Sequence, residues 1–472
     1  MPGSENSTAA WQQKCKKSNF YYPVWNLNSP MGLPRRKINA NSMKQLEPNS
    51  INSDNKTNYE GKLIFPSGFL WGSATSAHQV EGGNFNDWTE WEKTNAQRLA
   101  DEAKRERQKW QQEKFPEMFN PQNYISGQAC DHYNRFEQDF DIAKQLGQNA
   151  HRFSIEWSRI EPEEGKFSEK EIEHYRQVIK ALKERGLEPF VTLWHWSLPI
   201  WLAKKGGVKN KDFPKHFELY VKKIVEALGR EVKYWLTINE PEIYALNSYY
   251  RARWTPQKKG IFNFYFSMRS LMKAHKRAYR AIKKITPLSM VGVVCNLSDF
   301  KSSEGVVNAI LKIIFERFWN HRFLERVRHQ LDFIGLNFYF HNRIDYGLNK
   351  NKNEIISDAG WDTHPEGIEN VLMSLKRYDR PVYITESGMA DKEDKNRGWF
   401  IRETIGAVSR AISGGVNVQG YFHWSLMDNF EWDKGFWPRF GLVEVDYKTF
   451  ERKIRPSALE YAKICKNNIL EI

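Results

Sequence analysis

The sequence predicts an α/β fold, a single (β/α)8 TIM barrel with loop insertions. Short apolar runs recur between Phe69 and Phe422, and amphipathic stretches of helical period separate most of them. This alternation favours parallel strands joined by helices, and eight such strands favour a closed barrel over an open sheet. The length of 472 residues also suits one barrel with insertions.

The individual elements follow in chain order from this pattern. The expected strands are the runs 69–76, 150–155, 189–194, 234–238, 290–295, 333–336, 382–385 and 418–422. The stretches 168–185 and 215–228 have the period of amphipathic helices. Glycines at typical stop positions close several of the helices before the next strand, namely Gly147, Gly186, Gly229 and Gly414–Gly415.

Two polar segments lie outside the barrel pattern. Residues 1–60 are rich in Asn, Ser, Lys and Gln, and several prolines interrupt them. Because this composition buries too little apolar surface to offset the entropy of ordering, we predict a disordered tail over 1–60 and a barrel domain over 61–472. A second polar stretch covers 92–127, and its part from Asn95 to Lys114 predicts a charged surface helix after the first strand.

Composition narrows the classes of partner. The net charge is +14, but Lys and Arg are spread along the chain and match no nucleic-acid-binding module, so we expect no nucleic-acid partner. No apolar run approaches the ~20 residues that span a bilayer, and we expect no membrane partner. Scattered cysteines and the lack of an apolar signal-peptide core favour a cytoplasmic protein. His78, His195 and His423 lack the spacing of metal ligands, so we expect no metal. We expect no other cofactor either.

Polar and aromatic side chains stand just past the eight runs. They are Gln79, Arg152, His195, Asn239 with Glu240, Asn296, Asn337 with Tyr339, Glu386, and Trp424. In a parallel barrel these strand ends converge on one mouth, so we expect a polar pocket with aromatic walls. A single glutamate at a strand end is usually a solvated charge. Glu240 and Glu386 together, however, are the minimum equipment for cleaving a glycosidic bond.

Several segments, in order, carry a more specific signal. They are 65–82, 151–159, 194–196, 237–241 (Thr-Ile-Asn-Glu-Pro), 384–388 (Ile-Thr-Glu-Ser-Gly) and 424–432. From about residue 64 to the C-terminus the chain resembles glycoside hydrolase family 1, the β-glucosidase family, and these segments are similar to the motifs of that family. The stretch from Cys295 to Phe333 is short for the family, which predicts a reduced wall on the leaving-group side of the pocket.

The resemblance implies catalytic roles. Glu386 is expected to attack the anomeric carbon as an ionised nucleophile, with Arg152 beside it favouring that form. Asn337 and Tyr339 are expected to orient the same carboxylate by hydrogen bonds. Glu240 is expected to hold a proton near neutral pH, which requires a less polar setting or a negative neighbour such as Glu386.

The resemblance also implies residues that recognise the sugar. Asn239 is expected to bind its 2-hydroxyl. The groups expected at the 3-, 4- and 6-hydroxyls are Gln79, His195 and Glu431, joined by the indole N–H of Trp432. Trp424 is expected to form an apolar floor. For each of these residues the alternative is ordinary packing in the barrel.

The expected activity is that of a retaining β-glycosidase that releases terminal non-reducing β-D-glycosyl residues through a covalent glycosyl-enzyme. Retention requires the two carboxyl groups to be roughly 5–5.5 Å apart. The expected partners are small β-glycosides or oligosaccharides. Two alternatives stay open: a non-catalytic carbohydrate-binding protein of the same fold, and a transglycosidase. The preferred sugar and the oligomeric state also stay open.

Overall fold

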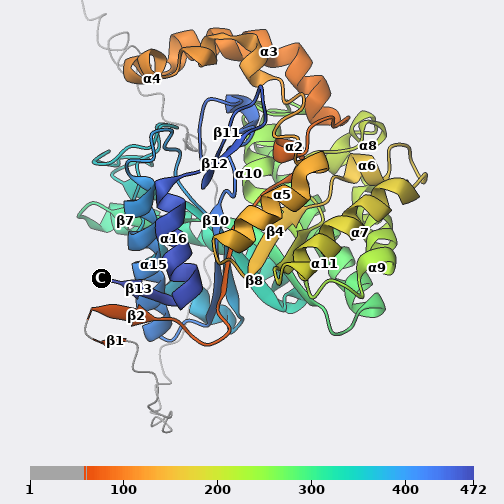
Figure 1. Ribbon diagram of the computed structural model, residues 1–472. Helices are drawn as coiled ribbons and strands as arrows, with labels where there is room; N and C mark the ends of the chain where they lie inside the picture. The colour runs from red at the N-terminus through yellow and green to blue at the C-terminus, as the bar shows by residue number, and fades with distance from the viewer. Residues whose placement is uncertain (1–57, 60) are drawn as a thin grey trace, which may run out of the picture.

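The structure is a computed structural model that describes residues 58–59 and 61–472. The tail predicted over 1–60 lies outside the described residues, apart from Asn58–Tyr59, which form strand β1 and pair with β2 (Lys62–Ile64). Strand β2 also pairs with β13 (Ile469–Glu471). The two ends of the described chain therefore meet in one small antiparallel sheet beside the barrel (Figure 1).

Eight parallel strands close into a barrel in the order β10-β3-β4-β5-β6-β7-β8-β9, which confirms the predicted fold. The strands are β3 (Leu70–Ala74), β4 (Ala150–Ser154), β5 (Glu188–Thr192), β6 (Tyr234–Asn239), β7 (Met290–Ser302), β8 (Phe333–Ile344), β9 (Val382–Ser387) and β10 (Val418–Trp424). Each overlaps one predicted run. Strands β7 and β8 extend well beyond their predicted ends and stay paired there, as the register Ser302↔Ile344 shows.

Helices between the strands cover the outside of the barrel (Figure 1). The longer ones are α5 (His132–Gln145), α7 (Glu169–Glu184), α9 (Phe213–Leu228), α11 (Ile261–Ile285), α12 (Val306–Glu316), α14 (Gly367–Leu375), α15 (Arg397–Ser413) and α16 (Pro456–Asn467). Shorter helices are α2 (Ala77–Val80), α6 (Trp157–Ile160), α8 (Ile200–Lys204), α10 (Pro241–Ala245) and α13 (Arg322–Val327). The predicted stop signals at Gly147 and Gly186 lie directly after α5 and α7 with positive φ.

The predicted surface helix from Asn95 to Lys114 differs from the structure in its bounds and its burial. Helix α3 spans Asp87–Glu106, and the separate α4 spans Lys109–Lys114. The start is earlier because Asn86 caps the helix, accepting hydrogen bonds from the backbone of Trp88 and Thr89. Since Trp88 is fully buried, α3 is part of the aromatic core above the strands and is not only a charged surface helix.

Aromatic rings fill the barrel interior below the pocket. Phe190 and Tyr234 stack with ring centroids 4.2 Å apart, and Phe422 lies 4.8 Å from Phe190. Gly292 makes this filling possible, because a Cβ at that position would come within 2.7 Å of the Phe333 ring. Because these rings fill the interior, a polar site can form only at the carboxyl ends of the strands.

Candidate active site

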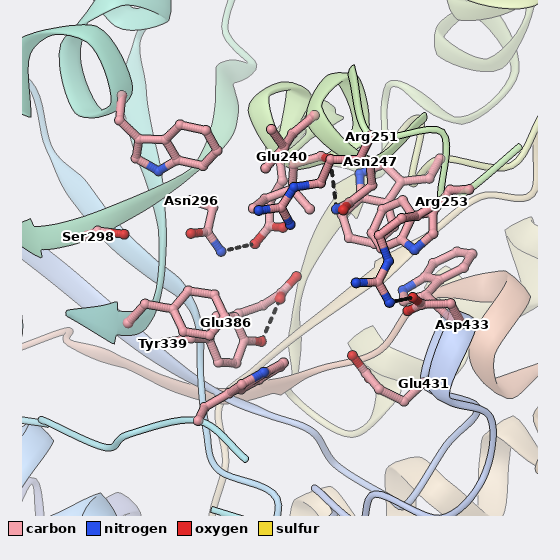
Figure 2. Close-up of a pocket in the computed structure, with 18 of the residues that line it drawn as sticks. Glu240, Asn247, Arg251, Arg253, Asn296, Ser298, Tyr339, Glu386, Glu431 and Asp433 are labelled. Atoms are coloured by element: carbon pink, nitrogen blue, oxygen red, sulfur yellow. Dashed lines mark hydrogen bonds and ion pairs between the residues drawn. The ribbon is translucent and has the colours of Figure 1, made fainter. Parts of the chain in front are cut away.

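One pocket opens at the carboxyl ends of the strands, and most of the predicted site residues line it. These are Gln79, His195, Glu240, Tyr339, Glu386, Trp424, Glu431 and Trp432. The other three, Arg152, Asn239 and Asn337, are fully buried and reach the pocket carboxylates directly or through one another. Figure 2 shows Glu240 and Glu386 reaching into the same space from two sides.

Glu386 is the next-to-last residue of β9 and is held by two different donors. Arg152 of β4 forms an ion pair with its Oε1, and Tyr339 Oη donates to its Oε2 at 2.7 Å. Burial and the charge of Glu386 raise the pKa of Tyr339 well above its usual value, so the phenol keeps its proton and donates. Arg152 is itself fixed, because it also donates to Thr192 Oγ1 at 3.1 Å.

Glu240 follows β6 and has neutral partners. Asn296 Nδ2 donates to its Oε1 at 2.9 Å (Figure 2). Asn337 Nδ2 donates to the same oxygen at 2.7 Å. Burial, followed by the charge of Glu386, raises the pKa of Glu240 to about 8. Both causes match the setting that the sequence analysis required of a proton donor. The two carboxyl groups thus differ in kind, one facing a guanidinium and the other facing amides.

The predicted role of Asn337 was wrong. It was expected to orient Glu386, but its amide nitrogen donates to Glu240, and its Oδ1 accepts from Thr385 Oγ1 at 2.8 Å. Arg152 and Tyr339 already occupy both oxygens of Glu386. The bond from Thr385 fixes the Asn337 amide so that its NH₂ group faces Glu240 across the barrel.

Asn239 links Arg152 to His195. Its Oδ1 accepts from Arg152 Nη2 at 2.6 Å, so its NH₂ group must face His195 Nε2, 3.1 Å away. Burial, with a smaller contribution from Arg152, lowers the pKa of His195 well below its usual value, so the ring is neutral. Its Nε2 therefore accepts from Asn239, and its proton resides on Nδ1.

Hydrogen bonds join Gln79 to the segment that follows β10. Gln79 Nε2 donates to Asn429 Oδ1 at 2.9 Å and to Phe430 O at 2.8 Å, and it lies 3.3 Å from Glu431 Oε2. Burial raises the pKa of Glu431 to about 7, although the nearby Lys434 opposes the shift. This carboxyl is thus only partly charged near neutral pH.

Trp432 lies in an aromatic cluster that the sequence analysis did not predict. Its ring centroid is 4.5 Å from that of Trp88, 4.9 Å from Trp196 and 6.3 Å from Trp254. His195 stacks on the Trp432 ring, with ring centroids 5.9 Å apart. Trp196 and Trp254 also line the pocket, although Trp254 comes from a loop with no strand-end signal.

Several further polar residues at the pocket were missed as site residues, among them Arg253, Asn296, Asp433 and Lys434. Asn296 stands at a predicted strand end, so its position was visible but its contact with Glu240 was not. Asp433 accepts from Arg253 Nη2 at 2.9 Å (Figure 2) and lies 3.4 Å from the ammonium of Lys434. Although burial opposes it, these cations hold the pKa of Asp433 below its usual value. The distance in sequence between 253 and 433 left no signal for this pair.

One group of side chains in the pocket lining is apolar. It includes Ile243, Leu246, Phe300, Phe315, Phe318 and Leu348. The prediction of a reduced wall on the leaving-group side rested on the short stretch from Cys295 to Phe333. That stretch supplies Phe300 from the extended part of β7, Phe315 from α12, and Phe318 from the turn that follows α12.

Three residues of the site have backbone conformations that L-residues seldom adopt. The φ angles are 80° at Trp196, 42° at Glu240 and 49° at Trp432. Glu240 is the residue between β6 and α10, and its backbone N–H donates to Val294 O at 2.9 Å. Such conformations persist only where the surrounding structure fixes them, and they concentrate at functional sites.

A closed parallel barrel with two inward carboxyl groups, one at the end of β9 and one just after β6, fits an enzyme of the glycoside hydrolase class. The family model "Glycosyl hydrolase family 1" matches residues 62–329 and 314–470, and the chain belongs to this family. A 1,4-beta-D-glucan glucohydrolase of Thermotoga neapolitana is 33% identical over 460 residues, covering 86% of this chain and 98% of that protein. The sequence-based assignment to the family is confirmed.

Solved structures agree with this assignment. A beta-glycosidase from Pyrococcus horikoshii is similar with a TM-score of 0.77 and 36% identity, covering 87% of this chain and 96% of the other. A beta-glucosidase from Thermotoga maritima in complex with glucoimidazole has a TM-score of 0.77 and 31% identity, covering 86% and 99%. The chain is therefore a β-glycosidase. Within the described part of the chain, no helix is long and apolar enough to cross a membrane.

Proposed function

We propose that the protein is a retaining β-glycosidase that releases terminal non-reducing β-D-glycosyl residues by double displacement. The observation that carries the proposal is the unequal environment of the two carboxyl groups. Glu386 is paired with Arg152, whereas Glu240 is bonded only to amides and has a pKa of about 8. One group is thus arranged to be ionised and the other to hold a proton, as this mechanism requires.

In the first step, Glu386 attacks the anomeric carbon while the bond from that carbon to the leaving-group oxygen breaks. Glu240 transfers its proton to that oxygen. The product is a glycosyl ester of Glu386, which has no negative charge. Since that charge contributes to the raised pKa of Glu240, its loss favours ionised Glu240.

In the second step, Glu240 takes a proton from water, and the resulting hydroxide-like oxygen attacks the anomeric carbon. The ester bond breaks and Glu386 leaves as a carboxylate. Two inversions give net retention. Asn239, fixed between Arg152 and His195, has one amide N–H left to bind the 2-hydroxyl. Gln79 and Glu431 would bind the hydroxyls on the other side of the sugar.

The test is the anomer of the first product. Proton NMR of an aryl β-glucoside during hydrolysis should show β-glucose first, followed by slow mutarotation, and α-glucose as first product would refute the mechanism. A panel of glucoside, galactoside, fucoside and mannoside defines the preferred sugar. Addition of methanol separates hydrolysis from transglycosylation, because a transglycosidase would give mainly methyl β-glycoside.

A further inference from the structure

Helix α12 turns five of its seven large apolar side chains outward, while Leu311 and Phe315 pack against the core. Val306, Val307, Ile310, Ile313 and Ile314 are all exposed, with exposed fractions from 52% to 77%, and the one buried side chain of the helix is Asn308. A surface helix ordinarily shows the reverse arrangement, with a polar face toward water. This apolar face therefore indicates a contact with something other than water.

The N-terminal end of α11 extends the same surface. Ile261, Phe262, Tyr265 and Phe266 are exposed there. Phe264 of α11 stacks on Phe318, which follows α12, with ring centroids 6.3 Å apart, so the start of α11 lies beside the chain that leaves α12. We call the five exposed residues of α12 and these four of α11 the α11–α12 patch. An apolar area of this kind on a soluble chain is typical of an interaction surface.

The α11–α12 patch is continuous with the leaving-group side of the pocket. Phe315 is the next residue after exposed Ile313 and Ile314, and it lines the pocket together with Phe318 and Leu348. Apolar surface therefore runs from outside the molecule into the site. The pocket lining also contains polar side chains, among them Asn247, Arg251, Ser298 and Asn342.

The charges around the patch are positive. Residues 257–270 contain three Lys or Arg and no Asp or Glu, and residues 306–322 contain three Lys or Arg and one Glu. Glu304 is the nearest acidic residue before α12. Basic and apolar side chains together fit an anionic bilayer surface, into which apolar groups insert while cations meet the headgroups. A symmetric contact with a second copy would instead place these cations against one another.

We propose that the α11–α12 patch docks on an anionic lipid surface and that the pocket behind it takes β-glycosides whose leaving group is a lipid chain. The first part is independent of the proposed function, and the second rests on it. The contact lies on the bilayer and needs no membrane-spanning segment. A lipid chain would pass along the patch to Phe315 and Phe318, with its sugar held between Glu240 and Glu386.

Vesicle sedimentation of the full chain tests the docking. The protein should sediment with vesicles of phosphatidylglycerol and phosphatidylcholine but not with phosphatidylcholine alone. Ile313→Ser combined with Ile314→Ser should weaken binding by about 100-fold, from about tenfold for each lost apolar contact. The matched control is Leu288→Ser with Leu459→Ser, which changes two exposed apolar residues outside the patch and should bind like wild type.

A second double variant tests how much the lysines near the patch contribute to vesicle binding. Lys258→Gln with Lys259→Gln should weaken binding to anionic vesicles by about 25-fold, since each cation near such a surface contributes about fivefold. The docking proposal is overturned if the wild-type protein does not bind anionic vesicles, or if the Ile313/Ile314 variant binds them as the wild type does. It is also overturned if ultracentrifugation shows a dimer that this variant abolishes while no vesicle binding occurs.

The substrate part is tested with alkyl β-glucosides from ethyl to octyl. Their kcat/KM should rise by up to about fourfold per methylene, and cellobiose should be a poorer substrate than octyl glucoside. On a long-chain glucoside in anionic vesicles the Ile313/Ile314 variant should lose activity while keeping wild-type kcat/KM on a soluble nitrophenyl β-glucoside. No activity on that soluble compound would refute the proposed function alone. A preference for cellobiose would refute only the lipid-chain substrate.

Discussion

Neutralising Glu386 should lower the pKa of Glu240, and the structure sets the size of the change. The pKa of Glu240 is raised from 4.5 to about 8, first by burial and then by the charge of Glu386. A unit charge ~5 Å away at an effective dielectric of ~20 changes the energy by about 3 kcal/mol. That energy corresponds to about 2 pKa units. With Glu386 esterified, the pKa of Glu240 should therefore fall to about 6 and stay above its usual value because the site remains buried.

The measurement uses a slow glycosyl-enzyme. A 2-deoxy-2-fluoro-β-glucoside with a dinitrophenolate leaving group should esterify Glu386 and leave Glu240 free. Carbon NMR of ¹³C-carboxyl-labelled glutamate, with the Glu240→Gln variant to assign the signal, gives the pKa before and after trapping. An unchanged pKa would show that Glu240 does not sense Glu386. A fall to about 4.5 would show that burial contributes little to the raised pKa, whereas in this structure burial is the larger cause.

The pH dependence of kcat/KM follows with a definite sign. Glu240 acts as an acid in the first step, so the active form is the protonated one. Its population is full well below its pKa and is lost as the pH rises through that value. The free enzyme should accordingly lose kcat/KM above about pH 8. In the Glu240→Ala variant this alkaline limb should disappear for substrates with good leaving groups.

Four further outcomes are expected. Azide should rescue Glu386→Ala with an α-glycosyl azide and Glu240→Ala with a β-glycosyl azide, as NMR of the products would show; wild-type turnover in either variant would refute the roles. Burial raises the pKa of Glu242 to about 8, so the folded chain holds a proton that the unfolded chain releases, and stability is lost as pH rises from about 4.5 to 8. Glu242→Gln should reduce this slope by up to about 1.4 kcal/mol per pH unit in urea unfolding, and an unchanged slope would contradict the shift. Deleting residues 1–57 should leave activity and Tm nearly unchanged, because every residue of the pocket lies beyond them; a loss of several degrees would mean that they dock on the barrel. A 6-phosphorylated glycoside should be the poorer substrate, because the partly charged carboxyl of Glu431 repels a phosphate and the nearby Lys434 already faces Asp433; equal kcat/KM for the two substrates would contradict this.

The fold and the positions of the main site residues could be predicted because both depend on local pattern. Strand runs and helix periods are properties of neighbouring residues, and parallel strands in a barrel bring their carboxyl ends together. The sequence therefore predicts that Glu240 and Glu386 lie at one mouth of the barrel. The same reasoning cannot say which carboxylate an amide faces. Asn337 was misassigned because that choice depends on a bond from Thr385 and on the donors already present at Glu386.

Features formed between distant loops were not predictable. The ion pair of Arg253 with Asp433 joins two segments that have no periodic signal, and its geometry follows from how loops pack above the strands. The outward face of α12 was hidden for another reason. Its apolar pattern is that of an ordinary buried helix, and only the structure shows that Asn308, rather than the isoleucines, faces inward.

The left-handed backbone at Trp196, Glu240 and Trp432 has a consequence for how this enzyme can change. Each such residue costs about 1–3 kcal/mol, so together they take up a large part of the roughly 5–15 kcal/mol that stabilises a typical domain. Glycine would relieve the strain at each position and would remove the group that the site needs. Selection for heat resistance alone should therefore favour stable barrels that have lost activity. A more stable and still active enzyme requires stabilising changes in the helices and lower strands instead.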